Sequence, residues 1–226
     1  MTGLELARAF YEHCLPTLCQ RMPDVLDRAA IGLVGEGSEC FGCDDKYSRD
    51  HDFGPAFCLW VPEDVLAAHR AHIEAALDAL PETFQGMPSR LAAARRQGPA
   101  AGRVGVIAIE DFYAFFTGLR RPPQQWQEWL AIPEYQLAAC TNGAVFVDNS
   151  GLFVKWREAL AAGYPADVRL KKLSCRCMHM AQCGQYNLPR SLKRGDTVAA
   201  MLVQARFAEA ALSFVYLANR RYMPFY

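Results

Sequence analysis

The sequence reads Ile31-Gly32-Leu33-Val34-Gly35-Glu36-Gly37-Ser38 in its first quarter, and Arg49-Asp50-His51-Asp52-Phe53-Gly54-Pro55 follows soon after. The first stretch has the pattern of a short buried strand that ends in a glycine turn. Glycine lets a backbone come close to a phosphate, and a helix that starts at Gly37-Ser38 would add free N–H groups and the serine hydroxyl. We therefore predict that Gly37 and Ser38 bind phosphate.

The second stretch has a carboxylate on each side of His51. Asp50 and Asp52 are two residues apart, so on a strand both side chains point to one face. Two acids at a strand entrance repel each other without a cation, and their hard oxygens suit Mg²⁺. The alternative is a polar surface loop, which we prefer for Asp44 and Asp45. We predict a Mg²⁺ site at Asp50 and Asp52, with His51 on the opposite face as a packed or orienting residue.

Hydrophobic periodicity predicts strands in the first 150 residues and helices alone after Gly151. The expected strands are 31–35, 57–61, 103–109 and 144–147. The expected helices are 4–22 with a break at Pro16, 63–80, 152–162, 165–183 and 195–219, and the last three are separated by breaks at Gly163, Gly184 and Pro189. The sequence thus predicts an α/β domain over residues 1–150 and a helical domain over 151–226, where the aromatic ending suggests that the natural protein continues.

Charge is balanced over the whole chain but not along it. The 226 residues are 52% hydrophobic and carry 24 basic and 24 acidic side chains, which excludes a disordered chain or a general polyanion binder. Residues 1–150 have a net charge of −8 and residues 151–226 one of +8. This pattern is compatible with a metal-and-phosphate cleft between two domains, or with two surfaces that simply attract each other.

The chain has the composition of a cytoplasmic protein. No uninterrupted apolar run reaches the ~18 residues of a membrane span, and the N-terminus has no secretory pattern. The nine cysteines are then expected to be reduced thiols. We expect no membrane partner and no strong non-specific binding to nucleic acid.

The spacing of Gly37-Ser38 and Asp50-His51-Asp52 resembles the signature of the nucleotidyltransferase superfamily related to DNA polymerase beta. Residues 47–55 are similar to an uncharacterised branch of it, known as a domain of unknown function. Three motifs in the helical half, Gly184-Gln-Tyr-Asn187, Arg194-Gly-Asp196 and Asn219-Arg-Arg-Tyr222, resemble the same branch. The resemblance implies an α+β fold, with a nucleotidyltransferase-type mixed sheet and flanking helices followed by an all-helical C-terminal lobe.

The resemblance also implies a reaction. Two Mg²⁺ ions, held by Asp50, Asp52 and a third carboxylate, would assist transfer of a nucleoside monophosphate, AMP from ATP, to a hydroxyl acceptor with release of pyrophosphate. The acceptor could be a small molecule, a protein side chain or an RNA end. We favour Glu110 as the third carboxylate, with Asp148 as a more distant candidate and no usable third acid as an equal alternative. In the basic helical half we expect Lys172, Arg190 and Arg194 to bind the nucleotide.

Two other classes of function remain open. A degenerate transferase could bind a nucleotide or a partner without turnover. A third hypothesis is a zinc or thiol protein. It is based on Cys40 and Cys43 and on the cluster Cys175, Cys177, His179 and Cys183. On a continuous helix Cys177 points about 160° away from the other three, so four ligands cannot converge. We expect these cysteines to be core residues.

Overall fold

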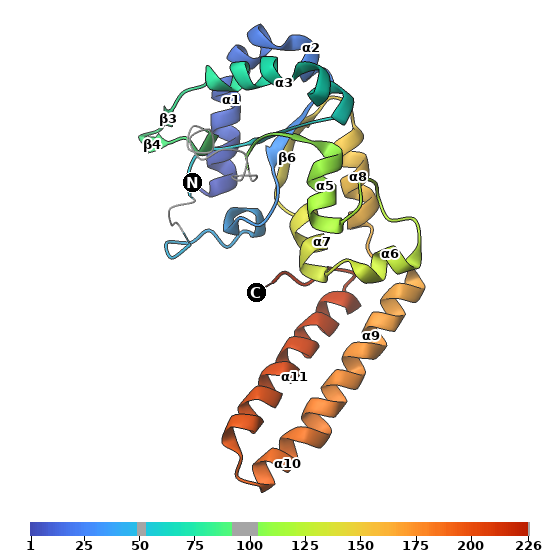
Figure 1. Ribbon diagram of the computed structural model, residues 1–226. Helices are drawn as coiled ribbons and strands as arrows, with labels where there is room; N and C mark the ends of the chain where they lie inside the picture. The colour runs from blue at the N-terminus through green and yellow to red at the C-terminus, as the bar shows by residue number, and fades with distance from the viewer. Residues whose placement is uncertain (49–52, 92–103, 226) are drawn as a thin grey trace. The chain divides into compact units, whose positions relative to one another are not determined.

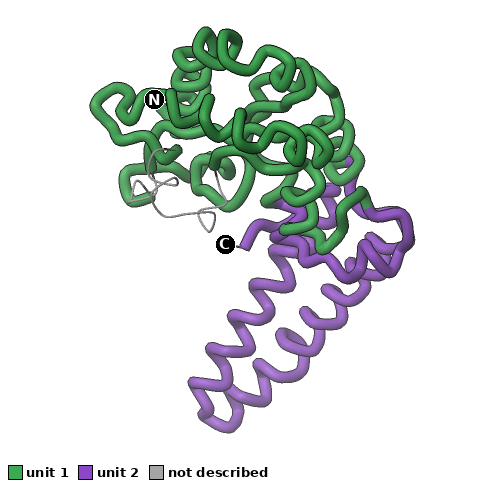
Figure 2. Tube along the Cα trace, turned by 45° about the horizontal axis from the view of Figure 1, so that its top comes forward, with its two compact units in different colours: residues 1–122, 139–161 green, residues 123–138, 162–226 purple. Residues whose placement is uncertain are grey.

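The computed structural model describes residues 1–48, 53–91 and 104–225, and the chain divides into two compact units (Figure 2). The first unit comprises residues 1–122 and 139–161, and the second comprises 123–138 and 162–226. The sequence suggested one boundary at residue 150; in the structure the second unit takes residues 123–138 from the middle of the chain and resumes at residue 162.

A four-stranded mixed sheet with the order β5-β2-β1-β6 forms the centre of the first unit (Figure 1). Its strands are β1 (Ala30–Leu33), β2 (Cys58–Val61), β5 (Gly105–Ala108) and β6 (Ala144–Asp148). β1 is antiparallel to β2 and β6, whereas β2 and β5 are parallel. The four predicted strands and the α+β class are confirmed. A small second sheet of β3 (Thr83–Phe84) and β4 (Met87–Pro88) was not predicted.

Helices cover both faces of this sheet. The helices of the first unit are α1 (Gly3–Arg21), α2 (Pro23–Leu26), α3 (Glu63–Asp78), α5 (Ile109–Thr117) and α8 (Leu152–Ala161). α1 and α3 form one hydrophobic core with Ile31 and Leu59 of the sheet. Trp60 points to the other face and stacks on Phe153 of α8, with ring centroids 4.0 Å apart. Because both faces are covered, β1 and β2 are buried at every position.

The first helix runs through Pro16 without a break, so the predicted interruption is wrong. A proline in a helix removes one backbone hydrogen bond and crowds the preceding turn. α1 nevertheless buries Phe10, Cys14 and Leu18 in the core, and its N-terminus has a capping box between Thr2 and Glu5. Tertiary packing along the whole helix outweighs the local cost of the proline.

The second unit is entirely helical in the residues that the structure describes. Its elements are α6 (Trp126–Ala131), the first part of α7 (Glu134–Thr141), α9 (Ala166–Met180), the π-helix η3 (Ala181–Asn187), α10 (Leu188–Lys193) and α11 (Thr197–Ala218). α9 and α11 lie side by side, and η3 and α10 connect them (Figure 1).

The chain stays helical from α9 to the end of α10, so the predicted breaks at Gly184 and Pro189 are wrong. Gly184 lies inside η3, where it lets the ring of Phe207 come close: a Cβ there would be 2.9 Å from the ring. Pro189 is the second residue of α10, and the chain passes through it directly from the π-helix η3 without a break. Gly184 and Pro189 are therefore both part of a continuous helical segment.

α11 is long and apolar enough to cross a membrane by length and composition alone, with a mean hydropathy of 1.5. Within the described part of the chain it is the one helix that meets this criterion. The sequence search for an uninterrupted apolar run missed it because Arg206 and Glu209 interrupt the helix.

Candidate functional site

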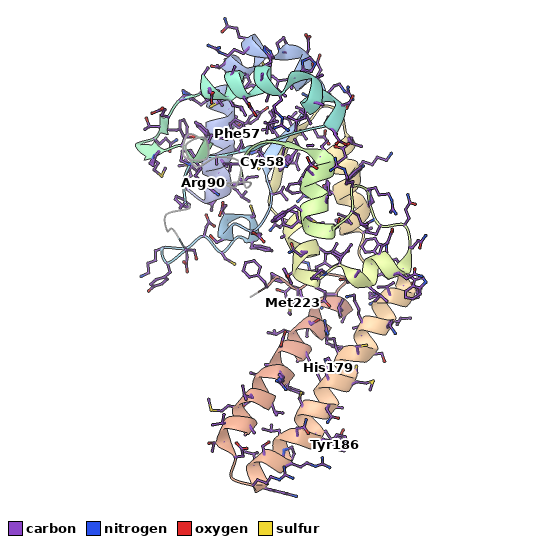
Figure 3. All side chains as sticks on the ribbon, viewed as in Figure 1. Phe57, Cys58, Arg90, His179, Tyr186 and Met223 are labelled. Carbon is purple, nitrogen blue, oxygen red and sulfur yellow. The ribbon has the colours of Figure 1, made fainter. Side chains whose placement is uncertain are left out.

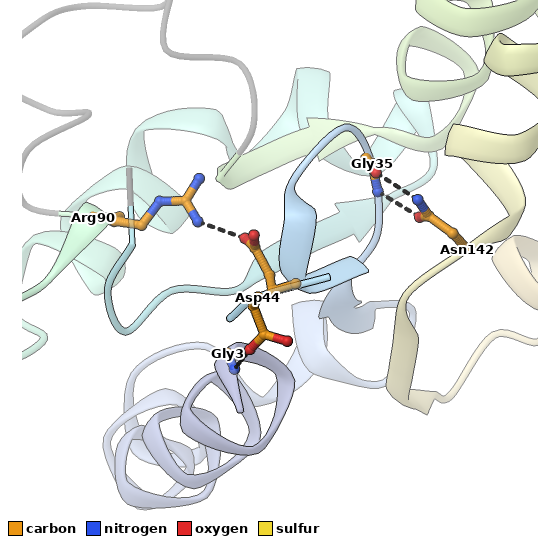
Figure 4. Close-up of polar contacts among 6 residues, drawn as sticks. Gly3, Gly35, Asp44, Arg90 and Asn142 are labelled. Carbon is orange, nitrogen blue, oxygen red and sulfur yellow. Dashed lines mark hydrogen bonds and ion pairs between the residues drawn. The ribbon is translucent and has the colours of Figure 1, made fainter. Parts of the chain in front are cut away.

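The candidate phosphate-binding residues lie in the segment that follows β1, residues 34–41, which we call the Gly-Ser loop. Gly35 has a positive φ of 139°, and its backbone makes two hydrogen bonds to the side chain of Asn142. The Gly35 N–H donates to Oδ1 at 2.9 Å, and Nδ2 of Asn142 donates to the Gly35 carbonyl at 2.7 Å (Figure 4). The N–H of Gly143 donates to the carbonyl of Cys40 at 3.0 Å. The turn before β6 therefore holds the Gly-Ser loop at two points.

Gly37 and Ser38 lie at the start of a shorter helix than predicted. Ser38 opens η1 (Ser38–Phe41), a 3₁₀-helix of four residues, and Gly37 before it is extended. One turn has a much smaller dipole than a full α-helix, so the anion-binding strength expected from a helix N-terminus is reduced. The features that remain for phosphate binding are the half-buried Ser38 hydroxyl and the close backbone approach at Gly37.

A buried ion pair joins this loop to Arg90. Arg90 Nη1 donates to Glu39 Oε1 at 2.9 Å, and the two side chains are only 14% and 10% exposed (Figure 4). The Glu39 carboxylate also packs against Gly37, where a Cβ would lie 2.4–2.5 Å from its carboxylate atoms. The Glu39 carboxylate thus accounts for a glycine at position 37 without any ligand.

Arg90 also contacts the segment that follows the aspartate pair. Its backbone N–H donates to the carbonyl of Pro55 at 3.0 Å, and a Cβ on Gly54 would lie 3.4 Å from the Arg90 side chain. Asp50 and Asp52 themselves lie outside the described residues. This segment continues through Phe57 into β2, which begins at Cys58. Figure 3 labels both residues and Arg90. One arginine therefore links the Gly-Ser loop to the chain just after Asp52.

The neighbouring acids act as loop residues, as predicted. Asp44 accepts a hydrogen bond from the Gly3 N–H at the start of α1. Asp45 Oδ1 accepts from the N–H groups of Tyr47 at 2.9 Å and Ser48 at 3.1 Å. Asp45 fixes the backbone of its own loop, whereas Asp44 holds the loop against the start of α1.

Glu110, expected as the third carboxylate, lies at the other end of the sheet. The Gly-Ser loop leaves β1 at the end where Gly32 pairs with Cys58, the first residue of β2. β5 runs parallel to β2, so Glu110 follows the far end, about 10 Å along the strands. There Glu110 Oε2 accepts from the Glu63 N–H at 3.0 Å and caps α3. Glu110 is therefore used as a helix cap at the end of the sheet opposite the Gly-Ser loop.

Asp148, the more distant candidate, is also at that far end. It pairs with Ala30, the first residue of β1, and its carboxylate accepts from the N–H groups of Gly151 and Val154 at 2.8 Å each. It caps α8. In the described parts of the chain no group of three or more His, Cys, Asp or Glu side chains could hold a metal. Glu39, within the Gly-Ser loop, is the acid whose carboxylate lies against Gly37.

The basic residues predicted to bind nucleotide are spread along the second unit. Lys172 of α9 lies over the ring of Tyr164, 4.7 Å from its centroid, and burial lowers its pKa. Arg190 of α10 lies 5.8 Å from the ring of Tyr186, which Figure 3 labels near the end of η3, and Arg194 is the C-cap of α10. Lys172 and Arg190 are separated by about 27 Å of helical path. A single phosphate group cannot bind both.

A buried polar cluster that the sequence did not reveal ties three helices of the second unit together. Arg176 donates to Glu134 Oε1 at 2.9 Å and to Ser213 Oγ at 2.7 Å, and Ser213 Oγ donates to Glu134 Oε2 at 2.9 Å. Glu134 and Ser213 are buried. Each of the three side chains is hydrogen-bonded to the other two, which indicates a structural role in holding α7, α9 and α11 together. No local pattern marks these residues, because they are 37 to 79 positions apart.

The cysteine cluster of α9 and η3 is neither a metal site nor a core. Cys175 and Cys177 are exposed and Cys183 is half-buried, so the prediction that they are buried is wrong. The reason is that α9 is largely exposed: Val168 is its buried residue. Cys40 is buried beside Glu39, whereas Cys43 is exposed. All nine thiols are free, as expected.

Comparison with known proteins identifies one family for part of the chain. A family model described as "Domain of unknown function (DUF4037)" matches residues 129–226, which is less than half of the sequence. This range includes the three motifs of the helical half and does not include the Gly-Ser loop. No curated protein and no solved structure matches the chain significantly.

Proposed function

We propose that this protein is a Mg²⁺-dependent nucleotidyltransferase that moves a nucleoside monophosphate, AMP from ATP, to a hydroxyl acceptor and releases pyrophosphate. The observation that supports it is the double contact of Arg90, with Glu39 next to Gly37-Ser38 and with Gly54-Pro55 next to Asp52. This contact places the Gly-Ser loop beside residues 54–55, which follow the aspartate pair in the sequence.

In this proposal the Gly-Ser loop binds the triphosphate. The Gly37 backbone and the Ser38 hydroxyl would donate to phosphate oxygens, and Arg90 would keep the loop in position through Glu39. The carboxylates of Asp50 and Asp52 have the donor chemistry that Mg²⁺ prefers, and the ion would neutralise charge on the triphosphate. The acceptor oxygen would attack the α-phosphorus as the bond to pyrophosphate breaks, and the hydroxyl proton would be lost.

A second candidate function is a nucleotide-binding module without turnover. The positions of Glu110 and Asp148 favour it, because both cap helices at the far end of the sheet. A site with only two carboxylates could still bind a triphosphate with one ion, but it would lack the third ligand that the superfamily resemblance implies.

The experiment that separates the two has two readouts. Nucleotide binding is measured by calorimetry with each of the four ribonucleoside triphosphates and Mg²⁺, and products are screened by mass spectrometry after incubation with cell extract. Binding together with a product 329 Da heavier than an acceptor, the mass of one added AMP, supports transfer. Binding without any product supports the module, and a chain that binds no triphosphate contradicts both proposals.

A further inference from the structure

α11 has apolar stripes on two opposite sides. The inner side packs within the unit, where Ala200, Ala210 and Leu217 are buried and Phe207 lies against Gly184. The outer side is exposed and repeats at alternating spacings of three and four residues. This outer stripe consists of Val198, Met201, Ala205, Ala208, Leu212 and Val215.

The outer stripe has the properties of a surface that is covered by another helix. Only 17% of the most apolar part of α11 is buried, although a helix that is apolar on all sides is normally enclosed. The alternating spacing of three and four is that of a coiled-coil seam. It is a narrow, regular strip about 25 Å long, which a second helix can match along its length.

We propose that the outer stripe packs antiparallel against the same stripe of a second copy of this chain. The stripe is symmetric about its midpoint: reversed, Val198 meets Val215, Met201 meets Leu212, and Ala205 meets Ala208. Equal sizes therefore oppose each other along the whole contact. The alanines lie at the centre, where two crossing helices approach most closely. A surface that is complementary to its own reverse is what a two-fold dimer needs.

The charged residues of α11 help to identify the partner that covers the outer stripe. Arg206 and Glu209 are the two charged residues of this helix, and they lie close to the midpoint of the stripe. At 100° per residue Glu209 borders the outer stripe and Arg206 lies about 60° further round the helix, so in the antiparallel pair both charges stay outside the seam and in water. A lipid bilayer would instead have to take both charges near the centre of the helix, at a considerable cost. The charges therefore favour a second copy over a membrane.

The test is the oligomeric state of the full chain, measured by sedimentation equilibrium over a range of concentrations. We expect a dimer, and we expect Met201→Lys or Leu212→Glu alone to raise its dissociation constant by about 100-fold or more, because each buries an unpaired charge. The double variant Met201→Lys/Leu212→Glu should restore the dimer. Only in the antiparallel pair does the introduced lysine of one copy face the introduced glutamate of the other.

Met178→Lys is the matched control, because Met178 and Met201 are both 70% exposed but Met178 lies on α9. It should leave the dimer unchanged. A wild type that stays monomeric overturns the proposal, whether or not it binds lipid vesicles. A dimer that survives Met201→Lys, or a double variant that remains monomeric, overturns the proposed interface or its direction.

Discussion

Glu39 and Arg90 form a buried ion pair across 51 positions of sequence, and the pair lies where the Gly-Ser loop meets the segment that follows Asp52. Glu39 is the residue after Ser38, and Arg90 follows the small β3–β4 sheet. The carboxylate packs on Gly37, and the arginine backbone binds Pro55. This one interaction therefore sets the position of Gly37-Ser38 relative to the chain that leads into β2.

Removing one partner of this pair should destabilise the fold strongly. Arg90→Met leaves Glu39 buried without its counter-charge, and we expect a loss of about 3–5 kcal/mol in the free energy of unfolding. The double variant Glu39→Gln/Arg90→Met removes both charges and should be more stable than Arg90→Met alone. Urea denaturation of the two single variants and the double variant gives the coupling energy.

The control is the exposed pair of Arg28 and Asp64, which has nearly the same distance, 3.0 Å, but side chains that are 52% and 67% exposed. Arg28→Met should change stability little, because water and salt screen an exposed pair. Equal losses for Arg90→Met and Arg28→Met would contradict the role that we assign to burial.

The sequence predicted the local features of this site but not its long-range contacts. The strand β1, the glycine turn and the loop roles of Asp44 and Asp45 follow from short patterns of residues. Arg90 has no such signal, because its importance comes from two contacts distant in sequence. Glu110 does have a local sequence signal, but that signal is ambiguous. An acid after a strand is typical both of a metal site and of a helix cap, and only the long-range contact of Glu110 with the Glu63 N–H reveals its capping role.

We expect Glu110→Ala to affect stability and not the reaction. Its carboxylate accepts from the first N–H of α3, so its loss should cost about 1 kcal/mol, as for other N-terminal caps. Nucleotide affinity and any turnover should match those of the wild type. Thermal unfolding and calorimetry with ATP check the two halves of this expectation. A variant that is stable but binds or transfers nucleotide poorly would return Glu110 to the candidate site.

The stability of the fold should fall at alkaline pH because of buried thiols. Burial raises the pKa of Cys58 from 9.0 to about 12, and that of Cys140 to about 12 as well. The unfolded chain loses these protons above pH 9 while the folded chain keeps them. Their contribution is therefore fully present below pH 9 and is lost as the pH rises towards 12.

The measurement is the free energy of unfolding in urea at pH 8 and at pH 10.5. Cys58→Ala should show a smaller decrease between the two pH values than the wild type, even if its stability at pH 8 is lower because of the cavity. Cys175→Ala is the control, since this thiol is exposed. An identical pH dependence in wild type and Cys58→Ala would show that this buried thiol does not contribute.

The last prediction tests the candidate site itself and separates catalysis from binding. Ser38→Ala removes one hydrogen-bond donor to a charged phosphate, so we expect triphosphate affinity to fall by about 1.5–3 kcal/mol, or roughly 10- to 150-fold.

Asp50→Asn/Asp52→Asn keeps the side-chain volumes and removes two negative charges. It should abolish Mg²⁺-dependent binding and any transfer, and the melting temperature without nucleotide should stay the same or rise, because the two acids no longer repel each other. Calorimetry with and without Mg²⁺, together with thermal unfolding, measures each effect. The exposed Asp45, which binds only its own loop, provides the control Asp45→Asn. If the double variant keeps full Mg²⁺-dependent affinity, the aspartate pair is not the metal site. If it loses affinity while the wild type forms no product with any triphosphate, the chain is a nucleotide-binding module.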